Sequence, residues 1–381
     1  MSCATGAAWT ARSIVMHKRI DSPRVWILLG QKGGDNAQVR TLANLLGWPC
    51  TEKQLCFNGL SRRFNILLGA SLDSLTCDSA PLEPPWPSLV ISIGKRSVPA
   101  ARWIKRRSGE ITRLVHLGRP WAPLSWFDLV VTTPQYRLPS RPNVIHNTLP
   151  VIRHEPQCLS NAGIVWAERF RALPRPWTAF LVGGPSRPFT LDQHTAASLG
   201  EAVSAHARQM GGSLLVTASR RCPPASFRAL AGEIHCPGYI HDPFDAHQGN
   251  PYLAYLALAD RFVVTCDSAS MIAEACLTGK PVSIIDLPVS HDRKMRRTEF
   301  LRSILLRKRG GVGESIYECL VDFGLITSTR DLRYFVDNLK QKRLITRLGE
   351  PVEAQVPLVF NEQDLERTCA RIRSLLEPRE S

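Results

Sequence analysis

The sequence predicts an α/β protein built from two Rossmann-like lobes that face a central cleft. A chain of 381 residues is longer than the roughly 250 to 300 residues that one hydrophobic core serves, so two domains are expected. Short apolar runs alternate with stretches of helical periodicity, which is typical of parallel sheets with crossover helices. This alternation stops in a proline-rich stretch near the middle of the chain and then starts again.

In the first half, residues 25–29 (VWILL) form an apolar run that stops at Gly30, and a helical pattern follows at Val39, Leu42 and Leu46. This order predicts a strand, a glycine loop and a helix. Further apolar runs, each a candidate strand, occupy residues 66–68, 89–93, 114–117 and 129–131.

Residues 134–156 are rich in proline and are interpreted as a linker between the lobes. Candidate strands then follow at residues 179–182, 213–217, 262–265 and 282–285, with helices expected at 191–210, 270–278 and 362–376. The expected organisation is a disordered extension at 1–22, a first lobe at 23–150, a second lobe at 151–361 and a C-terminal helix at 362–381 that could pack back on the first lobe.

The charge and residue composition of the chain limit the classes of partner that it can bind. Forty-eight Lys and Arg against 33 Asp and Glu give a net charge of +15, which favours nucleotides, nucleic acid or acidic lipid headgroups. No helix-turn-helix, zinc finger or aromatic platform is visible, so nucleic acid is not expected as a partner. The eleven cysteines form no metal or disulfide pattern. No run of 18 to 20 apolar residues occurs, so we expect a cytoplasmic protein, at most peripheral on the cytoplasmic face of a membrane.

The first motif is the segment GQKGGDNAQ at residues 30–38, between the first strand and the first helix. Gly33 and Gly34 permit a tight turn and close approach of a ligand to the N–H groups of the helix N-terminus. Asp35 at the mouth of the cleft could act as a general base on an acceptor hydroxyl. Alternatively, Asp35 and Asn36 serve only as helix N-caps.

The second motif, GGPSR at residues 183–187, also follows a predicted strand. Gly183, Gly184 and Ser186 could direct N–H groups and a hydroxyl at a phosphate whose charge Arg187 neutralises, unless the segment is a plain turn. The next strand ends in TASRR at residues 217–221, which brings Ser219, Arg220 and Arg221 to the same edge.

The third motif, TCDSASMIAEACLTGKP at residues 265–281, is the most informative. A strand delivers Asp267 and Ser268 to a helix N-terminus whose small residues leave its N–H groups open to a diphosphate. Glu274 lies one turn further along an apolar face, where a ribose diol could supply its hydrogen-bond donors. The alternative is a helix capped by Ser270 with Glu274 in an internal salt bridge.

At these residues the sequence resembles the mitochondrial fission (elongated mitochondria) proteins of plants and their bacterial relatives, which are described as glycosyltransferase-like. The resemblance runs from residue 25 to about residue 375. Its strongest marks are residues 33–38, 97–108, 127–131, 183–186, 217–221, 250–252 and 265–281. The sequence departs from the family pattern at residues 236–248 and 322–351.

The same loops resemble the two-lobed GT-B glycosyltransferases. That resemblance implies an acceptor site in the first lobe and a nucleotide-sugar site in the second, with the diphosphate at Ser186 and Ser268, the ribose at Glu274 and the base near Tyr239 and Ile240. It implies neither a metal nor a cofactor, because helix dipoles and arginines stabilise the departing diphosphate. The residues expected to bind the nucleotide sugar are Gly33, Gly34, Gly183, Gly184, Ser186, Arg187, Ser219, Arg220, Arg221, Tyr239, Ile240, Asp267, Ser268, Ala269, Ser270, Met271 and Glu274.

Three functions are compatible with these observations. The first is an inverting, metal-independent transfer of a sugar from a nucleoside diphosphate sugar to a glycan or lipid-linked acceptor, with peripheral contact to an anionic membrane. The second is a non-catalytic adaptor on a membrane surface that recruits a dynamin-like partner, since a fold does not determine a function. The third, a nucleotide-sugar epimerase, is disfavoured because a G-x-x-G-x-x-G loop and a Tyr-x-x-x-Lys pair are missing.

Overall fold

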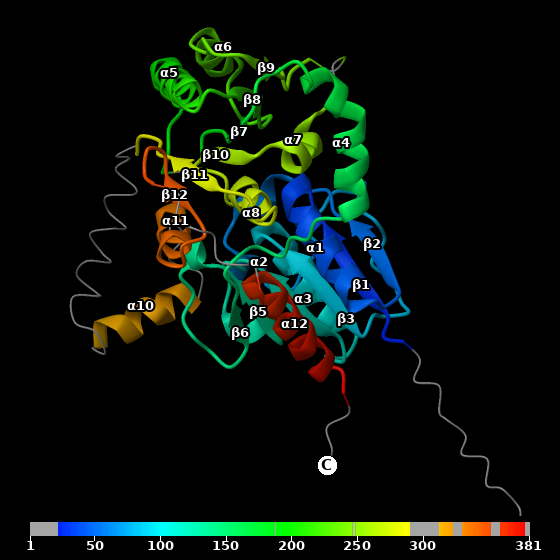
Figure 1. Ribbon diagram of the computed structural model, residues 1–381. Helices are drawn as coiled ribbons and strands as arrows, with labels where there is room; N and C mark the ends of the chain where they lie inside the picture. The colour runs from blue at the N-terminus through cyan, green and yellow to red at the C-terminus, as the bar shows by residue number, and fades with distance from the viewer. Residues whose placement is uncertain are drawn as a thin grey trace, which may run out of the picture.

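The chain forms two α/β lobes, drawn below and above in Figure 1. The computed structural model describes residues 22–186, 188–245, 247, 249–289, 312–322, 330–351 and 359–377. Arg187 and nearly all of the expected N-terminal extension therefore lie outside the described residues. Each lobe contains a six-stranded sheet whose neighbouring strands, within the described residues, all pair in parallel, so the predicted fold class is confirmed.

The first sheet belongs to the first half of the chain and has helices on its faces. Its strands, in spatial order, are β2 (Cys50–Gln54), β1 (Val25–Leu29), β3 (Leu89–Ile93), β4 (Arg113–Leu117), β5 (Leu129–Thr132) and β6 (Val144–His146). Two crossover helices, α1 (Gly33–Leu46) and α3 (Val98–Arg107), bury apolar side chains against it. Strand β1 is buried at all five positions, as expected for an inner strand of a parallel sheet.

The second sheet repeats this arrangement. Its strands, in spatial order, are β12 (Thr346–Arg347), β11 (Val282–Ile285), β10 (Arg261–Thr265), β7 (Trp177–Val182), β8 (Ser213–Ala218) and β9 (Gly238–Ile240). The helices of this half are α4 (Pro156–Phe170), α5 (Gln193–Gln209), α6 (Pro224–Gly232), α7 (Tyr252–Leu258), α8 (Ala269–Cys276), α10 (Val312–Asp322) and α11 (Leu332–Gln341). One continuous apolar core joins this sheet to its helices. Helix α10 is the exception, because its Tyr317 is buried with residues of the first lobe.

Two expectations about individual elements were wrong. Residues 66–68 belong to the short helix α2 (Asn65–Leu68) and not to a strand. Strand β6 lies inside the stretch that its prolines marked as a linker. Both errors have a physical cause, because a three- or four-residue element has too little periodicity to distinguish a strand from a turn of helix.

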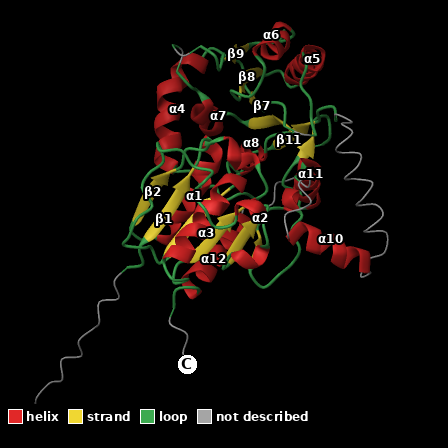
Figure 2. Ribbon diagram, turned by 180° about the vertical axis from the view of Figure 1, so that it is seen from behind, coloured by secondary structure: helices red, strands yellow, loops and turns green. Residues whose placement is uncertain are grey.

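The last helix, α12 (Val359–Ser374), returns to the first lobe (Figures 1 and 2). Its side chains Leu365, Cys369 and Ile372 are buried with residues of β1, β3 and α1. The carboxylate of Asp364 accepts a hydrogen bond of 2.6 Å from the backbone N–H of Thr148 in the segment that joins the lobes. The C-terminal helix thus packs on the lobe that the first half of the chain forms.

Within the described ranges, we find no helix whose length and apolarity would suffice for a bilayer crossing.

Candidate functional site

A pocket of about 240 Å³ lies where the first sheet meets the second lobe. Residues that directly follow β3, β4 and β5 line it, and the first residues of α1 and α8 complete its wall. In open parallel sheets, ligands bind outside the carboxyl ends of the strands. The pocket therefore lies where the two-lobed fold predicts a binding site.

Asp35 reaches this pocket from the third position of α1. Its side chain is 37% exposed, and its Oδ2 atom lies 3.9 Å from Nζ of Lys32. The N-cap position belongs to Lys32, which makes no side-chain cap hydrogen bond. The interpretation of Asp35 and Asn36 as N-caps is therefore wrong, and the carboxylate of Asp35 faces the pocket.

Asn36 has a structural role in the loop before α1. Its side-chain amide donates to the carbonyl of Gly30 and accepts from the N–H of Gly30, both at 2.9 Å. This pair of hydrogen bonds fixes the turn that leads from β1 into α1. The geometry of this turn also sets the direction in which the side chain of Asp35 projects.

The two lobes approach each other closely at Gly34. A Cβ atom at Gly34 would lie 3.7 Å from Oγ of Ser270, whereas one at Gly33 would meet nothing within 4 Å. The N-termini of α1 and α8 therefore converge on the same space. Each leaves its first N–H groups without intrahelical partners, which favours a negatively charged or polar ligand between them.

Helix α8 presents the start of the third motif to the pocket. Ser268 is its N-cap, 6% exposed and without a side-chain cap hydrogen bond. Ala269 and Ser270 line the pocket, and Met271 is half-buried beside them. The alternative in which Ser270 caps this helix is wrong, because the N-cap position belongs to Ser268. The hydroxyl of Ser270 faces the first lobe.

Asp267 fixes the glycine loop at residues 183–186 by hydrogen bonds. Its carboxylate accepts hydrogen bonds from the N–H of Gly184 and the hydroxyl of Thr265, both at 2.6 Å, and Thr265 accepts the N–H of Gly183 at 2.7 Å. Asp267 is fully buried, and burial raises the pKa of its carboxyl against the lowering effect of these hydrogen bonds. These two glycine N–H groups are thus bonded within the protein and do not point at a ligand. Among the described residues of this loop, Ser186 remains as the polar side chain.

Ser219, Arg220 and Arg221 lie at the end of β8. The hydroxyl of Ser219 donates to the carbonyl of Gly183 at 3.0 Å and accepts the N–H of Arg221 at 3.1 Å, so it connects two strand ends. Both arginine side chains are exposed. They add positive charge to the rim of the second lobe, while Arg187 is outside the described residues.

Glu274 has an internal partner that its sequence position did not reveal. The phenol of Tyr252 donates a hydrogen bond to the carboxylate of Glu274, and Nε2 of His154 lies 2.8 Å from the Glu274 backbone carbonyl. Burial raises the pKa of the Glu274 carboxyl, an effect that the Tyr252 hydrogen bond opposes. The alternative in which Glu274 forms an internal salt bridge is therefore wrong, because its partner is the neutral phenol of Tyr252. A ligand hydroxyl that binds Glu274 would have to displace this phenol.

Tyr239 and Ile240 differ in their surroundings. The ring of Tyr239 packs against Trp166 and Phe170, with ring centroids 5.8 and 5.4 Å away. Ile240, the last residue of β9, is 36% exposed. Only Ile240 of this pair presents its side chain substantially to solvent.

Several polar residues of the pocket lie outside the motifs that the sequence offers. Arg119, Thr132 and Gln135 line it and are at most 2% exposed. Oγ1 of Thr132 and Oε1 of Gln135 are buried and have no hydrogen-bond partner in the described part of the chain. The available signal was their position, since each follows or ends a strand at the edge where ligands bind.

Two further features distinguish the pocket wall. Trp121 has a φ of 57°, a left-handed conformation that is strained for a bulky residue, and the guanidinium of Arg119 lies 4.3 Å from its ring centroid. The lining also carries four cationic side chains (Lys32, Lys95, Arg119 and Arg330) and one carboxylate, Asp35. This charge balance favours an anionic ligand.

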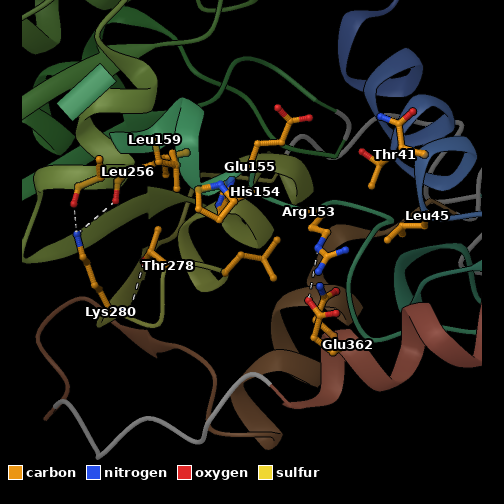
Figure 3. Close-up of a pocket in the computed structure, with 15 residues that line it drawn as sticks. Thr41, Leu45, Arg153, His154, Glu155, Leu159, Leu256, Thr278, Lys280 and Glu362 are labelled. Carbon is orange, nitrogen blue, oxygen red and sulfur yellow. Dashed lines mark hydrogen bonds and ion pairs between the residues drawn. The ribbon is translucent and has the colours of Figure 1, made fainter. Parts of the chain in front are cut away.

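A second cavity, of about 930 Å³, lies on the seam between the lobes (Figure 3). Its charged side chains are largely engaged within the protein. Lys280 donates to the carbonyl of Ala257 at 2.6 Å, and the guanidinium of Arg153 lies 4.0 Å from a carboxylate oxygen of Glu362 on α12. The first contact lies within the second lobe, and the second joins the segment between the lobes to α12. We therefore interpret this cavity as a structural gap between the lobes.

Two parallel six-stranded sheets, with helix N-termini of both lobes converging on one pocket, define a two-lobed α/β protein of the GT-B type. The chain belongs to the mitochondrial fission ELM1 family, whose sequence profile matches residues 33–310.

Two relatives illustrate this membership. The mitochondrial fission protein ELM1 of Arabidopsis thaliana is 28% identical over 248 residues, which cover 59% of this chain and 56% of that protein. The chain therefore spans little more than half the length of this relative. The uncharacterized protein RP120 of Rickettsia prowazekii (strain Madrid E) is 24% identical over 302 residues, 69% of this chain and 83% of that protein.

Solved structures show more distant likenesses. MurG of Acinetobacter baumannii gives a TM-score of 0.42 at 13% identity, with 92% of this chain and 100% of that chain covered. The UDP-GlcNAc 2-epimerase of Methanocaldococcus jannaschii gives 0.49 at 10% identity, with 92% and 99% covered. At these scores, neither likeness assigns a donor, an acceptor or a reaction to this chain.

Proposed function

We propose that this protein is a glycosyltransferase that transfers a sugar from a nucleoside diphosphate sugar to an acceptor hydroxyl, with inversion and without a metal. The observation that carries the proposal is the position of Asp35. Its carboxylate lies in the pocket, free of any capping role, on a helix whose N-terminus meets that of α8 across the lobes. A base and an anion-stabilising helix end are the two groups that such a transfer requires.

In this mechanism the acceptor occupies the pocket in the first lobe. Asp35 removes the proton of the acceptor hydroxyl, whose oxygen attacks the anomeric carbon of the donor. The bond from that carbon to the diphosphate breaks, and the diphosphate leaves with the electron pair. The N-terminus of α8, together with the exposed Arg220 and Arg221, stabilises the negative charge that develops on the leaving group.

The proposed donor site lies along the second lobe. The diphosphate contacts Ser186, Ser268 and Ser270, and the ribose reaches Glu274 by displacing the phenol of Tyr252. Ile240 lies at the end of β9 for contact with the base. The family's second candidate role, a non-catalytic adaptor on a membrane, is favoured by one observation, namely that the Arabidopsis relative is a mitochondrial fission protein.

Thermal unfolding in the presence of nucleoside diphosphates and their sugars tests the donor site. A ligand at 100 times its dissociation constant stabilises the folded state by about 2.7 kcal/mol. We expect one base to stabilise the wild type and to lose its effect in Ser270→Leu, which places an apolar side chain at the α8 N-terminus. Ser198→Leu, the same change at an exposed position of α5, is the matched control.

The two candidate functions give different results. Stabilisation by a nucleotide in the wild type and in Ser198→Leu, but not in Ser270→Leu, supports a donor-binding enzyme. No stabilisation at millimolar nucleotide contradicts the transferase and leaves the adaptor as the better proposal. Product analysis then separates transfer to an acceptor from epimerisation of the donor sugar.

A further inference from the structure

An exposed apolar cluster lies beside the pocket, on the loop around α2. Phe64, Ile66 and Leu67 expose 46%, 37% and 74% of their surfaces. Three large apolar side chains on four consecutive positions are unusual at a soluble surface, and such clusters mark sites of interaction. We refer to these three residues as the α2 cluster.

The residue between them anchors the loop. Asn65 is 1% exposed, and its amide nitrogen donates to the carbonyl of Lys95 at 2.9 Å and to that of Pro120 at 2.8 Å. Lys95, Arg119 and Trp121 line the pocket. The α2 cluster is thus fixed to the loops that form the pocket wall.

Basic residues lie beside the α2 cluster. Arg62 and Arg63 directly precede it and are exposed, and residues 57–72 contain no acidic residue. Nζ of Lys95 lies 5.8 Å from the ring centroid of Phe64 and donates to the carbonyl of Arg62 at 2.9 Å. Arg96, the next residue along the chain, is also exposed.

We propose that the α2 cluster inserts into the headgroup region of an anionic lipid bilayer while Arg62 and Arg63 contact its phosphates. Apolar side chains within a cationic rim are the chemistry of peripheral membrane binding. A stable protein interface engages roughly 20 residues on each side, far more than the three residues of the α2 cluster. The bilayer is therefore the occupant that the charge and the small apolar area favour.

This docking surface also restricts the source of the acceptor. Because Asn65 ties the α2 cluster to the pocket wall, docking would place the pocket close to the lipid headgroups. The acceptor of the proposed transferase is then a lipid-linked molecule, and this statement rests on the proposed function. The proposed docking to a bilayer does not depend on the proposed function.

Sedimentation with lipid vesicles tests the docking. We expect the full chain to bind vesicles that contain phosphatidylglycerol and to bind pure phosphatidylcholine much more weakly. Leu67→Glu should weaken binding about tenfold or more, because it replaces an inserted leucine with a charge. Replacing Arg62 and Arg63 with glutamine should weaken binding roughly fivefold per charge and reduce its dependence on salt.

The matched control is Ile164→Glu. Ile164 lies on α4 in the second lobe and exposes 74% of its surface, the same fraction as Leu67. This variant should bind vesicles like the wild type, and both variants should unfold near the wild-type temperature. Equal vesicle binding by Leu67→Glu and Ile164→Glu would overturn the proposal, as would equal binding to the two lipids.

The nucleotide experiment separates this proposal from the proposed function. Leu67→Glu should keep the stabilisation by nucleotide that the wild type shows. If vesicles bind through the α2 cluster but no nucleotide stabilises the protein, the docking stands and the transferase fails. If nucleotide binds and the vesicle results contradict docking, the transferase stands and the docking is refuted.

Discussion

Gly34 and Ser270 face each other across the junction of the lobes, where a Cβ atom at Gly34 would lie 3.7 Å from the Ser270 hydroxyl oxygen. Gly34 is next to Asp35 on α1, and Ser270 is the second residue of α8. The proposed base and the proposed diphosphate site therefore lie next to the same contact between the lobes. Small changes in this contact should alter chemistry more than stability.

Asp35→Asn should abolish most of the transfer activity and leave nucleotide binding unchanged. An amide cannot accept the acceptor proton, and general base catalysis contributes about 10² to 10⁴ in rate. Activity is measured as sugar released from the donor or bound to the acceptor, once a stabilising donor is known. Asp73→Asn, at an exposed aspartate of the same lobe, is the control, and similar rates for both variants would exclude Asp35 as the base.

Gly183→Ala should destabilise the second lobe severely. Its Cβ would lie 2.2 Å from Oδ1 of Asp267, so the buried carboxylate would have to move and lose hydrogen bonds. Such overpacking costs about 1 to 3 kcal/mol, and an unsatisfied buried carboxylate adds to it. Urea unfolding of this variant and of Gly33→Ala, where a Cβ meets nothing within 4 Å, makes the comparison. Two equal midpoints would refute this account.

Tyr252→Phe should lower stability by about 1 to 3 kcal/mol and strengthen nucleotide binding. The variant removes the hydrogen bond to Glu274 and leaves its half-buried carboxylate without that donor. A ribose that binds Glu274 would no longer compete with the tyrosine. Unchanged or weaker nucleotide affinity, measured by calorimetry, would argue that the ribose lies elsewhere.

His116 should make folding sensitive to acid. Burial lowers the pKa of its imidazole to about 3 in the folded protein, from an ordinary value of 6.5. The unfolded chain therefore binds the proton more tightly, so this stability is complete above about pH 6.5 and is lost as the pH falls toward 3. Each unit of difference corresponds to about 1.4 kcal/mol.

His116→Gln should flatten the pH dependence of the unfolding free energy between about pH 6.5 and pH 4. Glutamine can still form a hydrogen bond with Oγ of Ser92, which lies 2.9 Å from Nδ1 of His116. Urea unfolding at several pH values gives the slope. His194→Gln, at an exposed position of α5, is the control and should retain the wild-type slope. If His116→Gln also retained the wild-type slope, the role of His116 would be contradicted.

Much of the fold could be predicted because buried parallel strands are short, apolar and often followed by glycine. Residues 25–29 and 89–93 coincide with β1 and β3. Strand β2 escaped notice because its sequence CTEKQ is polar and its positions are largely exposed at a sheet edge. The apolar residues of α2 suggested a strand because their exposure on the protein surface has no signature in the sequence.

The candidate site was predictable only in part, because its contacts join residues distant in the chain. The motif containing Asp35 correctly marked a helix N-terminus at the edge of a sheet. The GGPS loop has the composition of an anion-binding turn, yet the N–H of Gly184 is bonded to Asp267, 83 residues away. Likewise, nothing near Glu274 in the sequence indicates Tyr252 as its partner, 22 residues before it.

The return of α12 to the first lobe has a consequence for the biosynthesis of the protein. Leu365, Cys369 and Ile372 complete a core that otherwise consists of residues from the first half of the chain. During translation this apolar face of the first lobe stays uncovered until residues 365–372 have left the ribosome. We therefore expect the nascent chain to depend, until α12 is made, on chaperones that shield apolar surfaces.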